Sequence, residues 1–223
     1  MDNLQNMNIF QQFFYYLQEN GNYVFSQFIQ HFLISIYGVL FAALIGIPFG
    51  VLISRRRQLA GWVVSIANLI QTVPSLAMLS ILMLGLGLGV NTVIVTVSLY
   101  SILPIIKNTY TGMIQVDSSV LDAGKGMGMN KWQRLYMIEM PLSVSVIMAG
   151  IRNALVIAIG ITAIGSFVGA GGLGDIIIRG TNATNGTAII LVGALPTALM
   201  AIITDWVLGI IERRLDPTSR IKK

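Results

Sequence analysis

Long apolar stretches dominate this chain, and only short polar stretches separate them. Residues 58–106 carry no charged side chain, which is more than twice the roughly 20 apolar residues that a helix needs to cross a bilayer. Backbone polar groups in hydrocarbon must be satisfied within the segment, so these stretches are expected to be helices. The hydropathy pattern predicts five spans, over residues 32–54, 62–84, 91–113, 143–168 and 187–211.

The predicted fold class is therefore all-α, a multi-pass transmembrane helical bundle of about five spans. Residues 1–31 are rich in aromatic side chains with polar residues between them, which predicts an external or interfacial N-terminal helix on the membrane surface. An aromatic belt that anchors the first span is the alternative. Residues 32–215 form the transmembrane domain and residues 216–223 a cytoplasmic tail. The spans leave no room for an ATPase or a soluble ligand-binding module, which are expected on separate chains.

Two features predict where spans bend and where they pack closely. Pro74 in the second span and Pro196 in the fifth predict kinked or broken helices. Small residues four apart allow two helices to approach closely. The pairs with this spacing are Gly46/Gly50, Gly85/Gly89 and Gly165/Gly169.

Composition supports lipid as the solvent and excludes several functions. The chain is 55% hydrophobic and 10% charged, against about 25% charged residues in a soluble domain. With no cysteine, cysteine nucleophiles and Cys-ligated metals are excluded, and the presence of only one histidine argues against a His-based metal site. No nucleophile, acid pair or metal cluster occurs at a plausible spacing, so the chain is not expected to be an enzyme or to hold a cofactor or metal. The pI of about 9.7 reflects basic residues at span ends, and no nucleic-acid partner is expected.

The basic residues also predict the orientation in the membrane. If the C-terminus is cytoplasmic, five spans place Arg179 alone, of 14 basic residues, on the outer side. This distribution satisfies the positive-inside rule and predicts an external N-terminus.

Residues 115–141 form the longest internal hydrophilic stretch, on the predicted cytoplasmic side. Its glycines at 124, 126 and 128 and the proline at 141 predict a short helix, a glycine turn and a second helix that leads into the fourth span. A loop of this length next to membrane helices is a natural docking surface.

This loop reads Asp122-Ala123-Gly124-Lys125-Gly126-Met127-Gly128 and, after residues 129–137, Ile138-Glu139-Met140-Pro141. It resembles the coupling loop of ABC-importer permeases, whose pattern is Glu-Ala-Ala, three residues, Gly, nine residues and Ile-x-Leu-Pro. Asp122, Gly124 and Met140 depart from the pattern conservatively. The resemblance implies that the ATPase-coupling residues are Asp122, Ala123, Gly124, Lys125, Gly126, Met127, Gly128, Ile138, Met140 and Pro141.

The likeness extends over residues 32–215, including Thr72-Val73-Pro74-Ser75-Leu76-Ala77 and Gly169-Ala170-Gly171-Gly172-Leu173-Gly174. These segments look like binding-protein-dependent permeases for glycine betaine, carnitine or choline, bacterial osmoprotectant importers that act in osmotic stress. That family implies a type I importer (MetI-like) fold in the cell membrane. It also implies two permease subunits, identical or different, two cytoplasmic ABC ATPase subunits that bind ATP and Mg, and an extracellular substrate-binding protein.

Two alternatives stay open at this point. Methionine-importer permeases share the fold and the loop pattern, so methionine or another small amino-acid-like solute is the alternative substrate. The second alternative is a channel or an ion-coupled carrier, although most of the spans lack the carboxylates that bind a coupling ion. The sequence assigns no substrate-binding residue.

Within the loop, Gly128 is expected to end the first helix in the left-handed conformation, and a bulky side chain there to clash. Asp122 is expected near the start of that helix, where its carboxylate accepts backbone hydrogen bonds or faces a basic group of the ATPase.

Four further expectations concern charged residues elsewhere. Asp205, inside the fifth span, is expected to reach the interface or to pair with a neighbouring basic group. Arg152 is expected to snorkel or to contact the coupling loop, and His31 to anchor the outer edge of the first span. Asp175 and Arg179, four residues apart, form a local pair or contact a binding protein.

Overall fold

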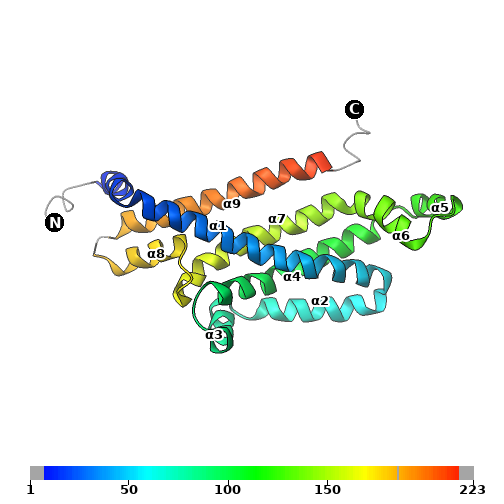
Figure 1. Ribbon diagram of the computed structural model, residues 1–223, viewed down its shortest axis with the longest axis horizontal. Helices are drawn as coiled ribbons and strands as arrows, with labels where there is room; N and C mark the ends of the chain where they lie inside the picture. Colours follow the sequence, from blue (N-terminus) through cyan, green and yellow to red (C-terminus); the bar gives the residue numbers. More distant parts are fainter. Residues whose placement is uncertain (1–7, 185, 216–223) are drawn as a thin grey trace. The chain divides into compact units, whose positions relative to one another are not determined.

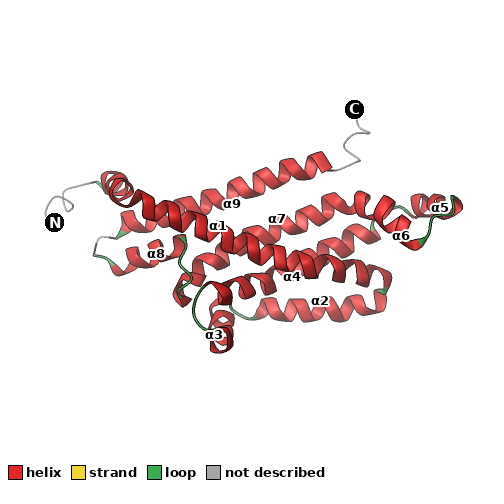
Figure 2. Cartoon of the chain, in the orientation of Figure 1, coloured by secondary structure: helices red, strands yellow, loops and turns green. Residues whose placement is uncertain are grey.

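The structure is a computed structural model that describes residues 8–184 and 186–215, and every regular element in this part of the chain is a helix (Figure 2). The all-α prediction is confirmed. The α-helices, labelled in Figure 1, are α1 (Ile9–Arg55), α2 (Arg57–Thr72), α3 (Ser75–Leu86), α4 (Val90–Ile114), α5 (Ser118–Gly126), α6 (Lys131–Arg134), α7 (Met140–Gly165), α8 (Leu173–Asn182) and α9 (Thr187–Leu215). A π-helical turn, Leu135–Glu139, joins α6 to α7, and a 3₁₀ turn, Ser166–Val168, follows α7.

Four helical stretches are long and apolar enough to cross a membrane: Ile9–Arg55, Val90–Ile114, Lys131–Val168 and Thr187–Leu215. Helices α2 and α3 pass the same test together, as a broken span or a re-entrant loop, and count as a fifth span if they are taken as one. The prediction of about five spans is therefore confirmed. The break falls at Pro74, which lacks a backbone N–H and disfavours helical geometry at Val73 before it. Pro196, in contrast, lies inside the continuous helix α9.

The first helix begins much earlier than the expected span. Helix α1 starts at Ile9, and its single non-helical residue is Asn20, at φ −117° and ψ 18°. Residue 32 is therefore not a helix boundary. Residues 9–19 are helical, as expected, and their position on the membrane surface stays a prediction.

The chain folds into two compact units, and each unit is assembled from three separate stretches of sequence. Among the described residues, unit 1 comprises residues 8–38, 73–98, 156–184 and 186–203, and unit 2 comprises residues 39–72, 99–155 and 204–215. The predicted cytoplasmic tail, residues 216–223, lies outside the described residues.

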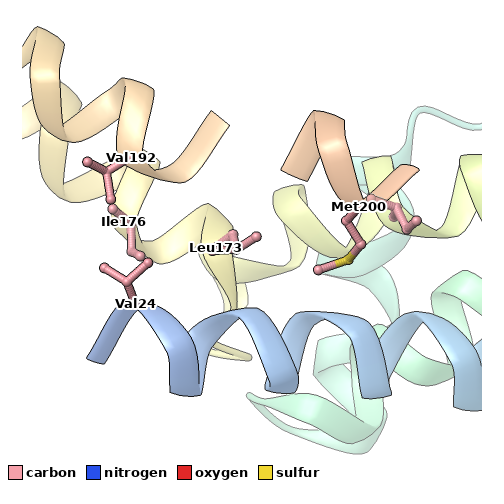
Figure 3. Packing of buried hydrophobic residues seen from close by; sticks show 6 residues of the cluster. Val24, Leu173, Ile176, Val192 and Met200 are labelled. Carbon is pink, nitrogen blue, oxygen red and sulfur yellow. The ribbon is translucent and has the colours of Figure 1, made fainter. Parts of the chain in front are cut away.

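The core of unit 1 joins the first helix to the helices that follow residue 156. Val24 of α1 packs with Leu173 and Ile176 of α8 and with Val192 and Met200 of α9 (Figure 3). Several aromatic side chains of the N-terminal segment pack against this cluster, including Phe13, Tyr16, Tyr23 and Phe28. Others remain exposed, including Phe10 and Phe14. The aromatic segment thus contributes one face to the core and leaves another for the surroundings.

Close glycine contacts occur in both units. In unit 2, a Cβ on Gly46 would lie 2.9 Å from Ile105, and one on Gly50 would lie 2.5 Å from Thr109. In unit 1, a Cβ on Gly165 would lie 2.6 Å from Val93. The close approach predicted for these glycines is confirmed. The expectation is wrong for Gly85 and Gly89, and for Gly169, where a Cβ would meet no atom within 4 Å.

Candidate functional site

The predicted loop is a folded, largely exposed segment of unit 2, which we call the coupling segment (residues 115–141). Its first helix, α5, begins after Asp117, whose Oδ1 accepts a hydrogen bond of 2.8 Å from the backbone N–H of Ser119. This hydrogen bond holds the pKa of the Asp117 carboxyl below its usual value. A negative charge at this position also suits the positive end of the helix dipole. Asp117 is therefore the cap of α5.

Asp122 lies in the middle of α5 and not at its start, so the expectation that it caps the helix is wrong. Its Oδ1 accepts a hydrogen bond of 2.6 Å from Nζ of Lys125 one turn later, and both side chains are exposed. An exposed pair of this kind contributes less than about 1 kcal/mol to stability. Asp122 is thus available to a partner at little cost to the fold.

The end of α5 is a Schellman motif, in which two backbone N–H groups turn back to the last helical carbonyls. Gly128 N–H donates to the carbonyl of Lys125 at 2.9 Å, and Met129 N–H donates to the carbonyl of Gly124 at 3.0 Å. Gly128 adopts a φ of +78°, a conformation that glycine takes without strain. The left-handed conformation predicted for Gly128 is confirmed. The expected clash is not found within this chain, because a Cβ there meets no atom within 4 Å.

The two parts of the coupling-loop pattern, residues 122–128 and residues 138–141, are in contact where Gly124 is buried against Ile138. A Cβ at Gly124 would lie 2.7 Å from Cδ1 of Ile138 and 3.4 Å from Sδ of Met129. The contact brings α5 to the π-helical turn although the two positions are distant in sequence. Because Cδ1 is the mobile end of its side chain, a single methyl group at position 124 would displace it easily. That tolerance agrees with the alanine in the family pattern.

The second helix of the segment starts with a capping box. Asn130 Oδ1 accepts hydrogen bonds from the backbone N–H groups of Trp132 and Gln133, both at 2.9 Å, and Oε1 of Gln133 accepts from the N–H of Asn130 at 2.8 Å. Helix α6 then continues through the π-helical turn into α7. The wider turn lies next to Pro141, whose ring would clash with the carbonyl four residues earlier in a regular α-helix. The predicted helix, glycine turn and second helix are therefore confirmed.

The structure separates the predicted coupling residues into exposed and buried groups. Ile138 is buried, Gly124 is buried beneath it, and Met140 is half-buried. The exposed members are Asp122, Ala123, Lys125, Gly126, Met127, Gly128 and Pro141. The first group holds the segment together, while the second is free to contact another molecule.

Sequence reasoning missed an ion pair at the base of the segment. Nη2 of Arg55, at the end of α1, lies 2.7 Å from Oε2 of Glu139, whose side chain is 5% exposed. A carboxylate buried to this extent needs a charged partner. Glu139 occupies the variable position of the family pattern, so no motif marked it, and Arg55 is too far along the chain for a local signal.

A charge cluster joins α7 to the last turns of α9 in unit 2. Arg152 binds Asp205 through two hydrogen bonds, Nε to Oδ1 at 3.0 Å and Nη2 to Oδ2 at 2.9 Å, and its Nη1 lies 2.6 Å from Oε2 of Glu212. The predicted pairing of Asp205 with a basic group is confirmed. The expectation that Arg152 snorkels or contacts the coupling segment is wrong, because two carboxylates hold its guanidinium.

In unit 1, Asp175 in the first turn of α8 pairs with Arg179 at 2.7 Å, which confirms the local pair. Tyr23 of α1, which sequence reasoning missed, also donates a hydrogen bond to the Asp175 carboxylate, and the Arg179 guanidinium lies 4.9 Å from its ring centroid. Burial alone would raise the pKa of Asp175, but the hydrogen bonds from Tyr23 and Arg179 leave it below its usual value.

His31 is fully buried, so its assignment as an interfacial anchor is wrong. Its Nε2 lies 3.0 Å from the carbonyl oxygen of Ile159 in α7. One turn further along α1, the hydroxyls of Ser35 and Thr162 are 3.0 Å apart. These contacts form a small buried polar zone between helices of unit 1. Among the described residues, no three His, Cys, Asp or Glu side chains come together in a way that could hold a metal ion.

The apolar spans define an integral membrane protein, with a capped, exposed helical segment between two of its spans. Residues 38–217 match the family described as the binding-protein-dependent transport system inner membrane component, and the chain belongs to this family. Its spans therefore form a transport permease component of an ABC importer. This assignment excludes the alternatives of a channel and an ion-coupled carrier.

Individual proteins resemble the chain over nearly its whole length. It is 64% identical over 217 residues to the carnitine transport permease protein OpuCD of Listeria monocytogenes, covering 97% of each chain. It is 63% identical to the glycine betaine/carnitine/choline transport system permease protein OpuCD of Bacillus subtilis, covering 97% of this chain and 94% of that one. A chain of the inward-facing MetNI methionine ABC transporter shares the fold, with a TM-score of 0.77 at 19% identity, over 86% of this chain and 96% of that one.

Proposed function

We propose that this chain is the permease subunit of an ABC importer for osmoprotectants of the glycine betaine, carnitine or choline type. The observation that carries the substrate class is the 64% identity to a carnitine permease over 97% of both chains. Methionine is not favoured, because the likeness to the methionine transporter, at 19% identity, extends to the fold alone. The uptake of these solutes serves growth under osmotic stress.

The transport step depends on separate subunits. Two cytoplasmic ABC ATPase subunits bind and hydrolyse ATP with Mg, so no cofactor or metal is expected in this chain. A second permease subunit, either the same chain or a different one, completes the pathway. An extracellular substrate-binding protein delivers the solute. Nucleic acid is not a partner.

The coupling segment transmits the motion of the ATPase. Its exposed side, with Asp122, Lys125 and Met127, docks on the ATPase. Its buried side, with Gly124 and Ile138, passes the displacement through the π-helical turn into α7. The support for this division is the exposure of the first group and the tight packing of the second.

The orientation follows from the basic residues, with the N-terminus outside and the coupling segment and the C-terminus in the cytoplasm of a bacterial cell. Because the chain has no cysteine, single cysteines at Asn22, Asn130 and Asn182 can be labelled in intact cells with a membrane-impermeant maleimide. Labelling is expected at Asn22 and Asn182. Strong labelling at Asn130 would reverse the orientation.

The function is tested by deletion of the gene and measurement of radiolabelled uptake at high salt. We expect loss of betaine, carnitine or choline uptake and poor growth, both restored by the intact gene. The matched control is methionine uptake in the same cells, which should not change. Normal uptake of the three quaternary amines together with impaired methionine uptake would contradict the proposed substrate class.

A further inference from the structure

A groove of about 740 Å³ opens in unit 2 between the last turns of α1 and the second half of the coupling segment. Its lining is both apolar and cationic. The apolar residues include Ile47, Val51 and Leu135, and the cationic residues are Arg55, Lys131 and Arg134. None of the described residues that line it is acidic.

The apolar residues on the α1 side of the groove belong to a candidate membrane span, which we infer places them at membrane depth. This span is Ile9–Arg55, and the eight residue steps from Ile47 to Arg55 correspond to about 12 Å of helix. Arg55 is the last residue of α1, where a span reaches the interface. A soluble partner could cover the cationic residues, but it would not enter the hydrocarbon beside Ile47.

Two of the three cations have no acidic partner in the described structure. Arg55 is neutralised by Glu139, with 2.7 Å between Nη2 and Oε2. Lys131 is exposed, with no ion pair to the described residues, and Nε of Arg134 is buried without a hydrogen-bond partner among them. Two unbalanced positive charges therefore meet an apolar slot, which suits a ligand with an anionic head and an apolar tail.

The aromatic residues beside these cations are of the kind found at membrane interfaces. The rings of Trp132 and Tyr136 stack with centroids 6.2 Å apart. Both line the groove, and their exposures are 68% and 66%. Tryptophan and tyrosine place a polar group at headgroup level and an apolar ring against acyl chains.

We propose that this groove binds an anionic membrane lipid, with its phosphate between Lys131 and Arg134 and an acyl chain along Ile47 and Val51. The inference rests on the proposed cytoplasmic position of the coupling segment, and it goes beyond the transport function. Basic pockets between helices on the cytoplasmic side suit anionic headgroups. A lipid bound here would contact both α1 and the segment that meets the ATPase.

The test is native mass spectrometry of the full-length chain in detergent, titrated with palmitoyl-oleoyl phosphatidylglycerol or with phosphatidylcholine of the same acyl chains. Two basic side chains predict a preference for phosphatidylglycerol on the order of 30-fold. The double variant Lys131→Gln/Arg134→Gln should lose this preference. The charge-conserving variant Lys131→Arg/Arg134→Lys should keep it.

The matched control is Arg56→Gln/Arg57→Gln, which removes two exposed charges next to the groove but not from its lining, and it should keep the preference. Equal binding of both lipids by the unchanged chain, or the same loss in the control, would overturn the proposal. So would displacement of phosphatidylglycerol by an equal concentration of inorganic phosphate. If Lys131→Gln/Arg134→Gln lost ATPase copurification but retained phosphatidylglycerol, the surface would belong to the ATPase. Uptake is not the readout, so failure here leaves the transport function untouched.

Discussion

Helix α5 and the α7–α9 charge cluster, both in unit 2, are stabilised in opposite ways. Helix α5 is held by backbone hydrogen bonds at its two ends and by Gly124, while its charged pair Asp122–Lys125 is exposed. The cluster is held by side chains alone, because Arg152 reaches carboxylates 53 and 60 residues away. Substitutions in α5 should therefore affect partner binding and transport before stability, whereas those in the cluster should affect stability first.

The largest expected effect comes from Gly128→Val. The position requires φ +78°, and a β-branched side chain resists it at a cost of roughly 1 kcal/mol or more. The variant should remain in the membrane. Because α5 would end in a different direction, we expect uptake to fall at least about tenfold and ATPase copurification to weaken.

The matched control for Gly128→Val is Gly61→Val, at a helical glycine in α2 where a Cβ also meets no atom within 4 Å. It should have a much smaller effect on uptake. Full transport by Gly128→Val at normal expression would remove the coupling segment from the mechanism.

Arg152→Gln tests the other side of the comparison. It leaves Asp205 and Glu212 without their shared partner, and their side chains are 45% and 21% exposed. We expect a loss of about 2 kcal/mol in the free energy of unfolding, between the values for exposed and buried pairs. This loss should appear as a lower Tm of the purified Arg152→Gln variant. Arg214→Gln, on the exposed end of α9, should leave Tm unchanged, and an equal Tm for both variants would contradict a stabilising cluster.

Asn130→Ala removes the capping box of α6 and should cost about 1 kcal/mol. Asn130→Ser keeps a hydroxyl acceptor and should recover most of it. Protease sensitivity of the coupling segment is the appropriate measurement, because opening of α6 exposes the backbone locally. Equal cleavage rates for the alanine and serine variants would show that the cap does not hold the segment.

Asp122→Asn should change stability by less than about 0.5 kcal/mol, because the pair with Lys125 is exposed. If Asp122 faces a basic group of the ATPase, uptake should nevertheless fall partially, by about two- to fivefold. Asp122→Lys/Lys125→Asp keeps the internal pair with its charges exchanged and should not restore uptake. Full uptake by this double variant would assign Asp122 to the local pair alone.

Gly124→Ala should have the smallest effect, within about 0.5 kcal/mol in stability. The gain in helix propensity offsets the displacement of Ile138 Cδ1, 2.7 Å from the added Cβ. Gly124→Leu should disrupt the segment, because a larger side chain cannot fit beneath Ile138. The two variants can be compared by their uptake rates, and a severe defect in Gly124→Ala would show that this contact is more rigid than the packing implies.

The sequence was sufficient wherever a local pattern determines the structure. Hydropathy located the spans, and Pro74 marked the break in the second span. The glycine motif marked the turn at Gly128. These features depend on neighbouring residues, whose geometry follows from backbone chemistry alone. Asp122 was misplaced because Asp117, the true cap of α5, lies outside the motif.

Long-range contacts could not be derived in the same way. Three contacts depend on which helices pack together: the ion pair of Arg55 with Glu139, the ion pair of Arg152 with Asp205, and the contact of buried His31 with Ile159. Hydropathy marks each helix as apolar but does not specify its neighbours. Trp132 stands between Lys131 and Arg134 in the sequence, but the groove that these residues form with α1 depends on the same packing.

The central claim is that the exposed side of the coupling segment binds the ATPase, and cross-linking tests it most directly. A photoreactive maleimide is attached to a single cysteine introduced at Met127, which is 71% exposed, and the cross-linked product is identified by mass spectrometry. A cysteine at Asn182, at the end of α8, is the matched control. We predict that Met127 cross-links to the ABC ATPase and Asn182 does not. Equal expression with no ATPase in the Met127 product, or with ATPase in both, would contradict the account.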